Sequence, residues 1–301
     1  MKRTWIHHAI IVNEGRRFAG SVVIEGEKIQ EIIEGDGAPA AVCDEQIDAQ
    51  GCFLLPGVID DHVHFRDPGL THKADMATET AAAAAGGVTS FMDMPNCNPQ
   101  TTTLEALENK FKDAATKCIV NYSFYFGATN NNADQLKALD KTHVCGVKLF
   151  MGASTGNMLV DRMEALKKIF SEAGMLIATH CEDQQIIREN TERFKQQYGE
   201  DLDISFHPLI RSEEACYHSS ALAVQLAKET GARLHILHIS TARELGLLED
   251  RPLHEKKITA EACVSHLMFC DEDYAQFGAR IKCNPSIKTK ADRDALRKAL
   301  T

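Results

Sequence analysis

Residues 57–69 of the chain read Gly57-Val58-Ile59-Asp60-Asp61-His62-Val63-His64-Phe65-Arg66-Asp67-Pro68-Gly69. An apolar run precedes the histidines: Leu54, Leu55, Val58 and Ile59. This run predicts a buried strand, and Pro68-Gly69 predicts a turn after it. Because side chains alternate along a strand, His62 and His64 point the same way and can bind one metal ion. Arg66 is two residues after His64, so its side chain should lie on the same face of the strand. Its planar guanidinium can pair with the carboxylate of a substrate. The alternative is a surface loop that carries two histidines without a metal.

Composition narrows the class of protein. With 301 residues and 44% hydrophobic content, the chain has room for one large domain or two ordinary ones. A net charge of −10 argues against a nucleic-acid or anionic-membrane surface and favours a small-molecule substrate. No apolar run approaches the roughly twenty residues that span a bilayer. The ten cysteines form no Cys-x-x-Cys pair, and the start lacks a signal-peptide core, so a cytoplasmic protein with free thiols is expected.

The pattern changes at Pro56. Residues 1–55 contain short β-rich segments and predict a small antiparallel sheet. From residue 56 to residue 301, apolar strands alternate with helical stretches, which predicts a parallel sheet wound by crossover helices. The predicted strands lie near 58–65, 89–95, 121–127, 146–151, 175–181, 233–239 and 257–263. The predicted helices include 76–85, 103–116, 161–173, 214–230 and a final stretch from Lys290.

Polar residues fall repeatedly at the carboxyl ends of these strands, where an α/β barrel of the TIM type, (β/α)8, builds its active site. Seven strands are one short of a closed barrel. The last helical stretch stops at Thr301. We therefore expect a chain that is truncated relative to a complete enzyme.

Three further strand ends supply candidate ligands. Lys148 lies in Gly146-Val147-Lys148-Leu149-Phe150, His180 in Ile177-Ala178-Thr179-His180-Cys181-Glu182, and His238 in Ile236-Leu237-His238-Ile239-Ser240. Taken singly, His180 or His238 is more often a core or surface residue than a ligand. Together with His62 and His64 they favour a zinc-type centre, because zinc prefers imidazole ligands.

Lys148 needs a separate explanation, because a lysine inside a buried strand is costly unless its charge is removed or paired. Carbamylation by CO2 would convert it into an anionic carboxylate that can bridge two metal ions. The alternative is a lysine paired with a substrate or a nearby carboxylate.

These motifs, in this order, resemble the dihydroorotases of the amidohydrolase superfamily. The resemblance rests on His-x-His with Phe-Arg-Asp-Pro-Gly, Met94-Pro95-Asn96-Cys97-Asn98-Pro99, Gly-Val-Lys-Leu-Phe-Met-Gly, Thr-His-Cys-Glu and Leu-His-Ile-Ser. It runs from about residue 50 onward. It implies that residues 1–55 are the N-terminal part of a composite β-sandwich and that residues 56–301 are a metal-dependent hydrolase barrel, incomplete at its C-terminal end.

The resemblance also implies roles for individual residues. His62 and His64 would bind one zinc ion, His180 and His238 a second, and carbamylated Lys148 would bridge the two. Arg66 and Asn96 would hold a substrate carboxylate, and Asn284 in Cys283-Asn284-Pro285 would contact the substrate ring. His207, Arg211 and Glu214 match a connecting segment of the family with structural roles.

One departure from the family concerns the proton-transfer residue. The family places a catalytic Asp on its eighth strand, within an Asp-His-Ala-Pro-His type motif, and this sequence has no such motif. No catalytic acid or base is therefore identified, which accords with a truncated chain.

The resemblance implies reversible hydrolysis of dihydroorotate to N-carbamoyl-aspartate, a step of pyrimidine biosynthesis. Arg66 beside Asn96 favours a substrate with a carboxylate over allantoin or a neutral hydantoin. Allantoinase or hydantoinase (dihydropyrimidinase) activity remains an alternative, as does a non-catalytic scaffold if the chain ends at Thr301. A homodimer is expected from the frequency of dimers among such folds.

Overall fold

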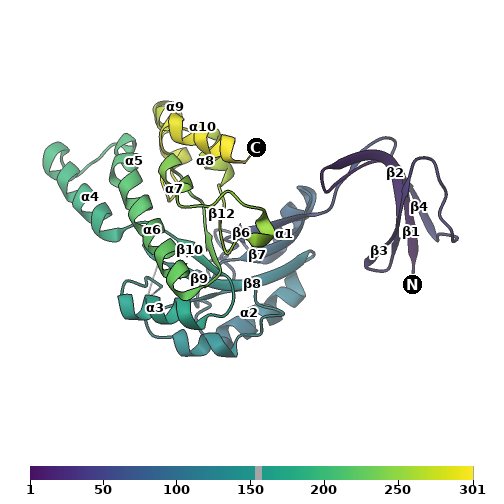
Figure 1. Cartoon of the computed structure of the whole chain (residues 1–301), viewed down its shortest axis with the longest axis horizontal. Helices are drawn as coiled ribbons and strands as arrows, with labels where there is room; N and C mark the ends of the chain where they lie inside the picture. The colour runs from purple at the N-terminus through teal and green to yellow at the C-terminus, as the bar shows by residue number, and fades with distance from the viewer. Residues whose placement is uncertain (153–157, 301) are drawn as a thin grey trace. The chain divides into compact units, whose positions relative to one another are not determined.

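The computed structural model describes residues 1–152 and 158–300 (Figure 1). Contacts within the chain divide it into two compact units. The first unit comprises Met1–Ile59 together with Gly87–Thr89, and the second comprises Asp60–Gly86 together with Ser90–Thr301.

The first unit is a five-stranded sheet with the order β3-β2-β1-β4, in which β5 also pairs with β1. Its strands are β1 (Arg3–Asn13), β2 (Arg16–Glu25), β3 (Lys28–Glu34), β4 (Glu45–Asp48) and β5 (Phe53–Leu54). The β1–β2 and β2–β3 pairs are antiparallel, as predicted. The prediction was wrong for β4 and β5, which pair with β1 in parallel. Residues 35–44 connect β3 to β4, and β4 runs in the same direction as β1. A tight hairpin joins only antiparallel strands, so this parallel pair needs the longer connection.

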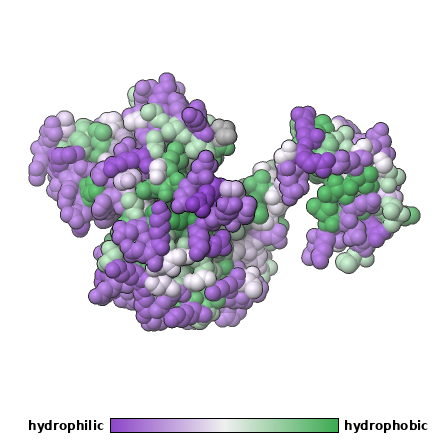
Figure 2. Space-filling view, viewed as in Figure 1, coloured by the Kyte–Doolittle hydropathy of each residue, from purple (hydrophilic) through white to green (hydrophobic). Residues whose placement is uncertain are grey.

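The first unit has a small core. Its fully buried apolar cluster consists of Ala9, Ile11 and Val22. Hydrophobic surface remains on the sheet, visible as green atoms in Figure 2, and Ile29, Ile32 and Ile47 are among its exposed side chains.

The second unit is built on a seven-stranded sheet with the order β12-β11-β10-β9-β8-β7-β6. Adjacent strands from β7 to β12 are parallel. The strands are β6 (Val58–Val63), β7 (Val88–Asp93), β8 (Asn121–Gly127), β9 (Gly146–Phe150), β10 (Ile177–His180), β11 (Leu234–Ile236) and β12 (Ile258–Ala260). All seven predicted strands are confirmed, in sequence order across the sheet. This regular order brings the carboxyl ends of the strands to one edge.

Helices connect the strands. The longer ones are α1 (Met76–Ala85), α2 (Leu104–Lys117), α3 (Met163–Glu172), α4 (Gln184–Tyr198), α6 (Glu213–Thr230) and α10 (Lys290–Ala299). Asp75 and Thr103 cap α1 and α2 by accepting hydrogen bonds from backbone N–H groups of the first turn. The five predicted helices are confirmed. Helix α4 was not predicted, because it buries only Ile187 and so lacks a clear apolar stripe.

Shorter helical turns complete the second unit. They are α5 (His207–Ile210), α7 (Ala242–Leu245), α8 (Val264–Met268) and α9 (Tyr274–Phe277), with the 3-10 turns η1 (Ala133–Ala138), η2 (Ile204–Phe206), η3 (Leu253–Glu255), η4 (Asp271–Asp273) and η5 (Gly278–Ile281). Among the described residues, no helix is both long and apolar enough to cross a membrane. All ten cysteines are free thiols.

The core of the second unit follows the central strands. Every residue of β9 is buried, including Lys148. Strand β6 differs, and here the prediction of a buried approach to His62 was wrong: Leu55, Val58 and Ile59 are 60%, 54% and 61% exposed. Strand β6 lies at the edge of the sheet, so only one of its flanks is covered by a neighbouring strand.

Candidate metal centre

Four histidines from three strand ends form one cluster in the second unit. His62 lies in β6 and His64 just after it, His180 ends β10, and His238 follows β11. The ring centroids are 5.2 Å apart for His62 and His64, 5.3 Å for His62 and His238, and 4.8 Å for His180 and His238. The parallel sheet thus brings together side chains that lie up to 176 positions apart in the sequence (238 − 62).

His62 and His64 present their Nε2 atoms to the same point. These two nitrogens are 3.2 Å apart. On the far side of each ring, Nδ1 of His62 lies 2.5 Å from Oε1 of Glu261, and Nδ1 of His64 lies 2.8 Å from Oδ1 of Asn96. Oxygen acceptors at both Nδ1 atoms place the ring protons there, which leaves the two Nε2 lone pairs facing each other.

Burial keeps His64 neutral. It lowers the pKa of His64 to about 3, and the nearby charge of His62 acts in the same direction. A neutral imidazole is the form that binds a metal ion. Two nitrogens bound to one tetrahedral zinc ion at about 2.0–2.1 Å would be roughly 3.3 Å apart, close to the separation found here.

His180 and His238 form a second pair. Nδ1 of His180 lies 3.0 Å from Nε2 of His238. Nε2 of His180 lies 2.9 Å from Oε2 of the buried Glu182 and donates its proton there, so the lone pair on Nδ1 faces His238. Burial lowers the pKa of both imidazoles, and that of His238 lies well below its usual value.

Glu182 fixes the position of His180. Burial alone would raise the pKa of Glu182, but its hydrogen bond with His180 and the charge of Arg211 hold it below the usual range. Arg211 donates from Nη1 to the same carboxylate oxygen. Sequence analysis assigned Arg211 only a structural role and gave Glu182 no role. Their contacts place both directly behind a candidate ligand.

Lys148 is buried among these groups. Its side chain projects over the Phe150 ring, with Nζ 4.4 Å from the ring centroid, and the residue is 1% exposed. Among the described residues, no carboxylate forms an ion pair with it. Burial lowers the pKa of Lys148 to about 7. Its charge in turn lowers the pKa of His64, His180 and His238.

Glu261 was missed by sequence analysis. It follows β12 directly, at the same relative position as the histidines on their strands. Besides His62, it contacts Nε2 of His235 at 3.2 Å and accepts a hydrogen bond from the backbone N–H of His238 at 3.2 Å. Burial opposes ionisation of Glu261, but the hydrogen bonds from His235 and His62 outweigh it and hold its pKa far below the usual range. The available signal was an acidic residue at the end of a predicted strand.

Arg66 and Asn96 lie side by side. Nη1 of Arg66 donates to the backbone oxygen of Asn96 at 2.9 Å. Because Oδ1 of Asn96 accepts from His64, its Nδ2 remains available as a donor next to the guanidinium. Arg66 adopts a left-handed backbone conformation with φ of 59°. The loop therefore places two donors beside the histidines.

Asn284 is the predicted site residue that the structure does not connect to the others. It is exposed and lies between η5 and α10, next to the buried Pro285. Among the hydrogen bonds of the described residues, none joins Asn284 to the four histidines. Its role toward the ring stays a prediction.

The residues present fit a pair of divalent metal ions. Two sets of imidazole nitrogens converge at 3.2 Å and 3.0 Å, and the outer nitrogens of His62, His64 and His180 are held by oxygen acceptors. Nδ1 of His238 is buried without a hydrogen-bond partner. Neutral imidazoles in such pairs are the ligand type that zinc prefers.

Comparisons with known proteins give the family. Residues 51–244 match the family described as Dihydro-orotase-like. The chain is 32% identical over 298 residues to an allantoinase of Deinococcus radiodurans, covering 95% of this chain and 64% of that protein. It is 33% identical over 278 residues to a dihydroorotase of Methanosarcina mazei, covering 89% of this chain and 59% of that protein. The chain thus spans less than two thirds of the length of these relatives.

A solved structure gives the same fold. The L-hydantoinase of Arthrobacter aurescens superposes with a TM-score of 0.92 at 25% identity, over 100% of this chain and 67% of that one. The predicted α/β barrel class is confirmed as an amidohydrolase-type fold, here a seven-stranded half-barrel with a separate N-terminal sheet. The ordered motifs, the fold and the match over residues 51–244 show that this chain belongs to the dihydro-orotase-like family.

Proposed function

We propose that this chain supplies the metal centre and the substrate carboxylate site of a cyclic amide hydrolase, and that its substrate is dihydroorotate. The reaction adds water across the ring amide C–N bond and yields N-carbamoyl-aspartate, reversibly. The observation that carries the proposal is the convergence of the His62 and His64 Nε2 atoms at 3.2 Å, with both Nδ1 atoms tied to oxygen acceptors.

Two zinc ions per chain suit this donor set. His62 and His64 would hold one, His180 and His238 the other. When bound, such ions supply Lewis acidity toward the amide carbonyl and toward water. Glu261 and Glu182 orient His62 and His180 through the nitrogen that does not face the metal position. Glu261, with its low pKa and its histidine partners, acts as a positioning residue rather than as a proton acceptor.

Carbamylation would allow Lys148 to supply an anionic oxygen ligand to such metal ions. The neutral amine attacks the carbon of CO2, a nitrogen–carbon bond forms, and the displaced proton leaves to solvent. The product is an anionic carbamate, which suits a position between four imidazoles better than an ammonium does. Native mass spectrometry tests this step: the intact protein should be heavier by one CO2 per chain, and the increment should be absent from the Lys148→Ala variant.

Arg66 and Asn96 support the choice of dihydroorotate. A carboxylate placed beside them would accept charge-assisted hydrogen bonds from the guanidinium and a further one from Nδ2 of Asn96. A site built to pair a carboxylate disfavours analogues that lack one. Neither allantoin nor an unsubstituted hydantoin offers that group.

The names of similar proteins favour a second candidate, allantoin ring opening. Several relatives that match most of this chain are named allantoinase. A substrate panel separates the two: purified protein loaded with zinc is assayed with dihydroorotate, allantoin, hydantoin and dihydrouracil. Dihydroorotate should give the highest kcat/KM. A higher value for allantoin would replace the dihydroorotase proposal with the allantoinase one.

A non-catalytic scaffold is the third alternative. A scaffold has no use for metal ligands, so zinc content separates it from an enzyme. Metal analysis after dialysis should give about two more zinc equivalents for the unmodified protein than for the His62→Ala/His180→Ala variant. Absence of bound zinc in the unmodified protein would favour the scaffold.

A further inference from the structure

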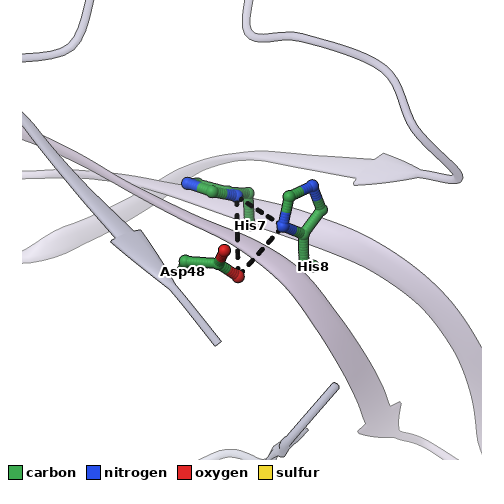
Figure 3. A group of neighbouring side chains, drawn as sticks. All are labelled: His7, His8 and Asp48. Atoms are coloured by element: carbon green, nitrogen blue, oxygen red, sulfur yellow. Dashed lines mark hydrogen bonds and ion pairs between the residues drawn. The ribbon is translucent and has the colours of Figure 1, made fainter. Parts of the chain in front are cut away.

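The first unit contains two adjacent histidines at a break in strand β1. The β1–β2 register shifts between Ile6 and Ala9, and His8 adopts a left-handed backbone conformation with φ of 53°. In a regular strand, neighbouring side chains point to opposite faces. This bulge instead turns His7 and His8 toward each other, with their Nδ1 atoms 3.1 Å apart (Figure 3).

Asp48 joins the two histidines from the neighbouring strand. It lies opposite His7 in the parallel β1–β4 pair. Its Oδ1 lies 2.9 Å from Nδ1 of His8 and 4.0 Å from Nδ1 of His7 (Figure 3). Three potential ligand atoms of types that zinc prefers, two imidazole nitrogens and one carboxylate oxygen, therefore converge on one point.

Hydrogen bonding alone does not satisfy this group. Nδ1 of His8 carries either one proton or one lone pair, yet it faces both Nδ1 of His7 and Oδ1 of Asp48. With a proton, it must divide one N–H between Oδ1 of Asp48 and the lone pair of His7. Without one, its lone pair faces a carboxylate oxygen. A cation can accept all three donors at once.

We propose that His7, His8 and Asp48 bind a divalent transition-metal ion of the zinc type, with water completing the coordination. Nitrogen and oxygen ligands of a tetrahedral zinc ion lie roughly 3.3 Å apart, and the three separations here, 2.9, 3.1 and 4.0 Å, surround that value. The His8 side chain is 64% exposed and that of Asp48 46%, so an ion reaches the group from solvent.

The site is separate from the histidine cluster of the second unit and does not depend on the proposed function. All three residues belong to the first unit. Because they come from β1 and β4, a bound ion joins these strands through their side chains as well as through their backbone pairing. It therefore stabilises the edge strand β4, which has only four residues and all of them exposed.

The chain has one tryptophan, and its position allows a direct measurement. Trp5 lies on the same strand, with its ring centroid 4.5 Å from that of His7. Titration with Cu2+ should quench Trp5 fluorescence, because Cu2+ binds imidazole sites strongly and quenches only nearby indoles. Zn2+, which has a filled d shell and does not quench, should compete: a large excess of Zn2+ added first should raise the copper concentration at half-quenching.

Variants assign the quenching to these residues. His8→Asn keeps a residue that tolerates positive φ, and Asp48→Asn keeps the acceptor for the backbone N–H of Gln50. Each should raise the copper concentration at half-quenching at least tenfold. His143→Gln is the matched control, because His143 forms an exposed pair with Asp140 at 2.9 Å but has no third donor among the clusters of the described residues. It should leave the titration unchanged.

The His62→Ala/His64→Ala variant tests independence from the second unit and should be quenched like the unmodified protein. Circular dichroism confirms that each variant is folded. The proposal is overturned if His8→Asn and Asp48→Asn are quenched at the same copper concentration as the unmodified protein, or if a large excess of Zn2+ leaves the copper concentration at half-quenching unchanged.

Discussion

The carboxylate of Glu261 lies 2.5 Å from Nδ1 of His62, although 199 positions separate the two residues in the sequence. The contact joins the two edge strands of the sheet order, β6 and β12, through their side chains. A carboxylate behind a metal-binding histidine fixes the ring tautomer and raises the basicity of the opposite nitrogen.

Replacing Glu261 with Gln should therefore weaken zinc binding at His62 by about 10- to 100-fold. The amide oxygen still accepts the ring proton, but the negative charge is lost. Competition with a chromophoric chelator measures the zinc affinity. Glu255→Gln is the control, because the Glu255 carboxylate pairs with the exposed His254 instead. Equal zinc affinity in the Glu261→Gln and unmodified proteins would contradict the positioning role.

Replacing Arg66 with Gln should lower kcat/KM for dihydroorotate by about 10- to 100-fold, since a hydrogen bond to a charged group contributes about 1.5–3 kcal/mol. Steady-state kinetics with dihydroorotate gives the value. Activity on hydantoin serves as the internal control and should change little, because that ring has no carboxylate. A parallel loss on both substrates would mean that Arg66 only holds the Asn96 loop, which its hydrogen bond to the Asn96 backbone makes the natural alternative.

Much of the fold could be predicted because the signals are local. Apolar runs bounded by turn residues locate all seven strands of the larger sheet, and the alanine-rich run 76–85 locates helix α1. The parallel pairing of β4 and β5 with β1 could not be predicted, since it depends on where the chain returns after a loop rather than on the residues of the strands. Helix α4 was missed because its sequence is polar on average and buries only Ile187.

The candidate metal centre was also predicted only in part. His62, His64, His180 and His238 were predicted from their positions at strand ends, and the sheet brings them together. Glu261 was missed, because a single acidic residue outside the quoted motifs gives no signal of its partner on another strand. Glu182 lies in a quoted motif and Arg211 was expected to be structural, but their ion pair behind His180 was not predicted. Such outer contacts depend on tertiary packing, which the sequence does not display.

A buried ion pair holds the loop that carries Asn96. Nζ of Lys110 lies 2.7 Å from Oδ2 of Asp93, both side chains are 1% exposed, and Nζ also donates to the backbone oxygen of Met94. Lys110→Met should lower the free energy of unfolding by about 3–5 kcal/mol, because it leaves the Asp93 charge buried without its partner. Urea denaturation gives the value.

The same helix provides the control for this pair. Lys112 and Glu108 lie on α2 at the same distance, 2.7 Å, but are exposed, so Lys112→Met should change stability little. The double variant Lys110→Met/Asp93→Asn should recover part of the loss, because it removes the unpaired charge. Equal free energies of unfolding for the Lys110→Met and Lys112→Met variants would mean that the Lys110–Asp93 pair does not hold the loop.

Buried His266 should make the second unit sensitive to acid. Its Nε2 lies 2.9 Å from the backbone oxygen of Pro285, and its Nδ1 is buried without a partner. Burial lowers its pKa; the charge of Lys288 acts in the same direction, whereas the hydrogen bond to Pro285 and the charge of Glu182 oppose it. Cys283 Sγ lies 3.7 Å from Nε2.

Because the pKa of His266 is lower in the folded state than its usual value of 6.5, the unfolded state binds more protons as the pH falls below that value. The stability should therefore be full at neutral pH and decline on acidification. His266→Gln keeps an N–H donor for Pro285 without a titratable group, so its urea midpoint should fall less between about pH 7.5 and about pH 5.5 than that of the unmodified protein. His143→Gln, at an exposed position, should follow the unmodified protein. An identical decline in all three proteins would assign the acid sensitivity to other groups.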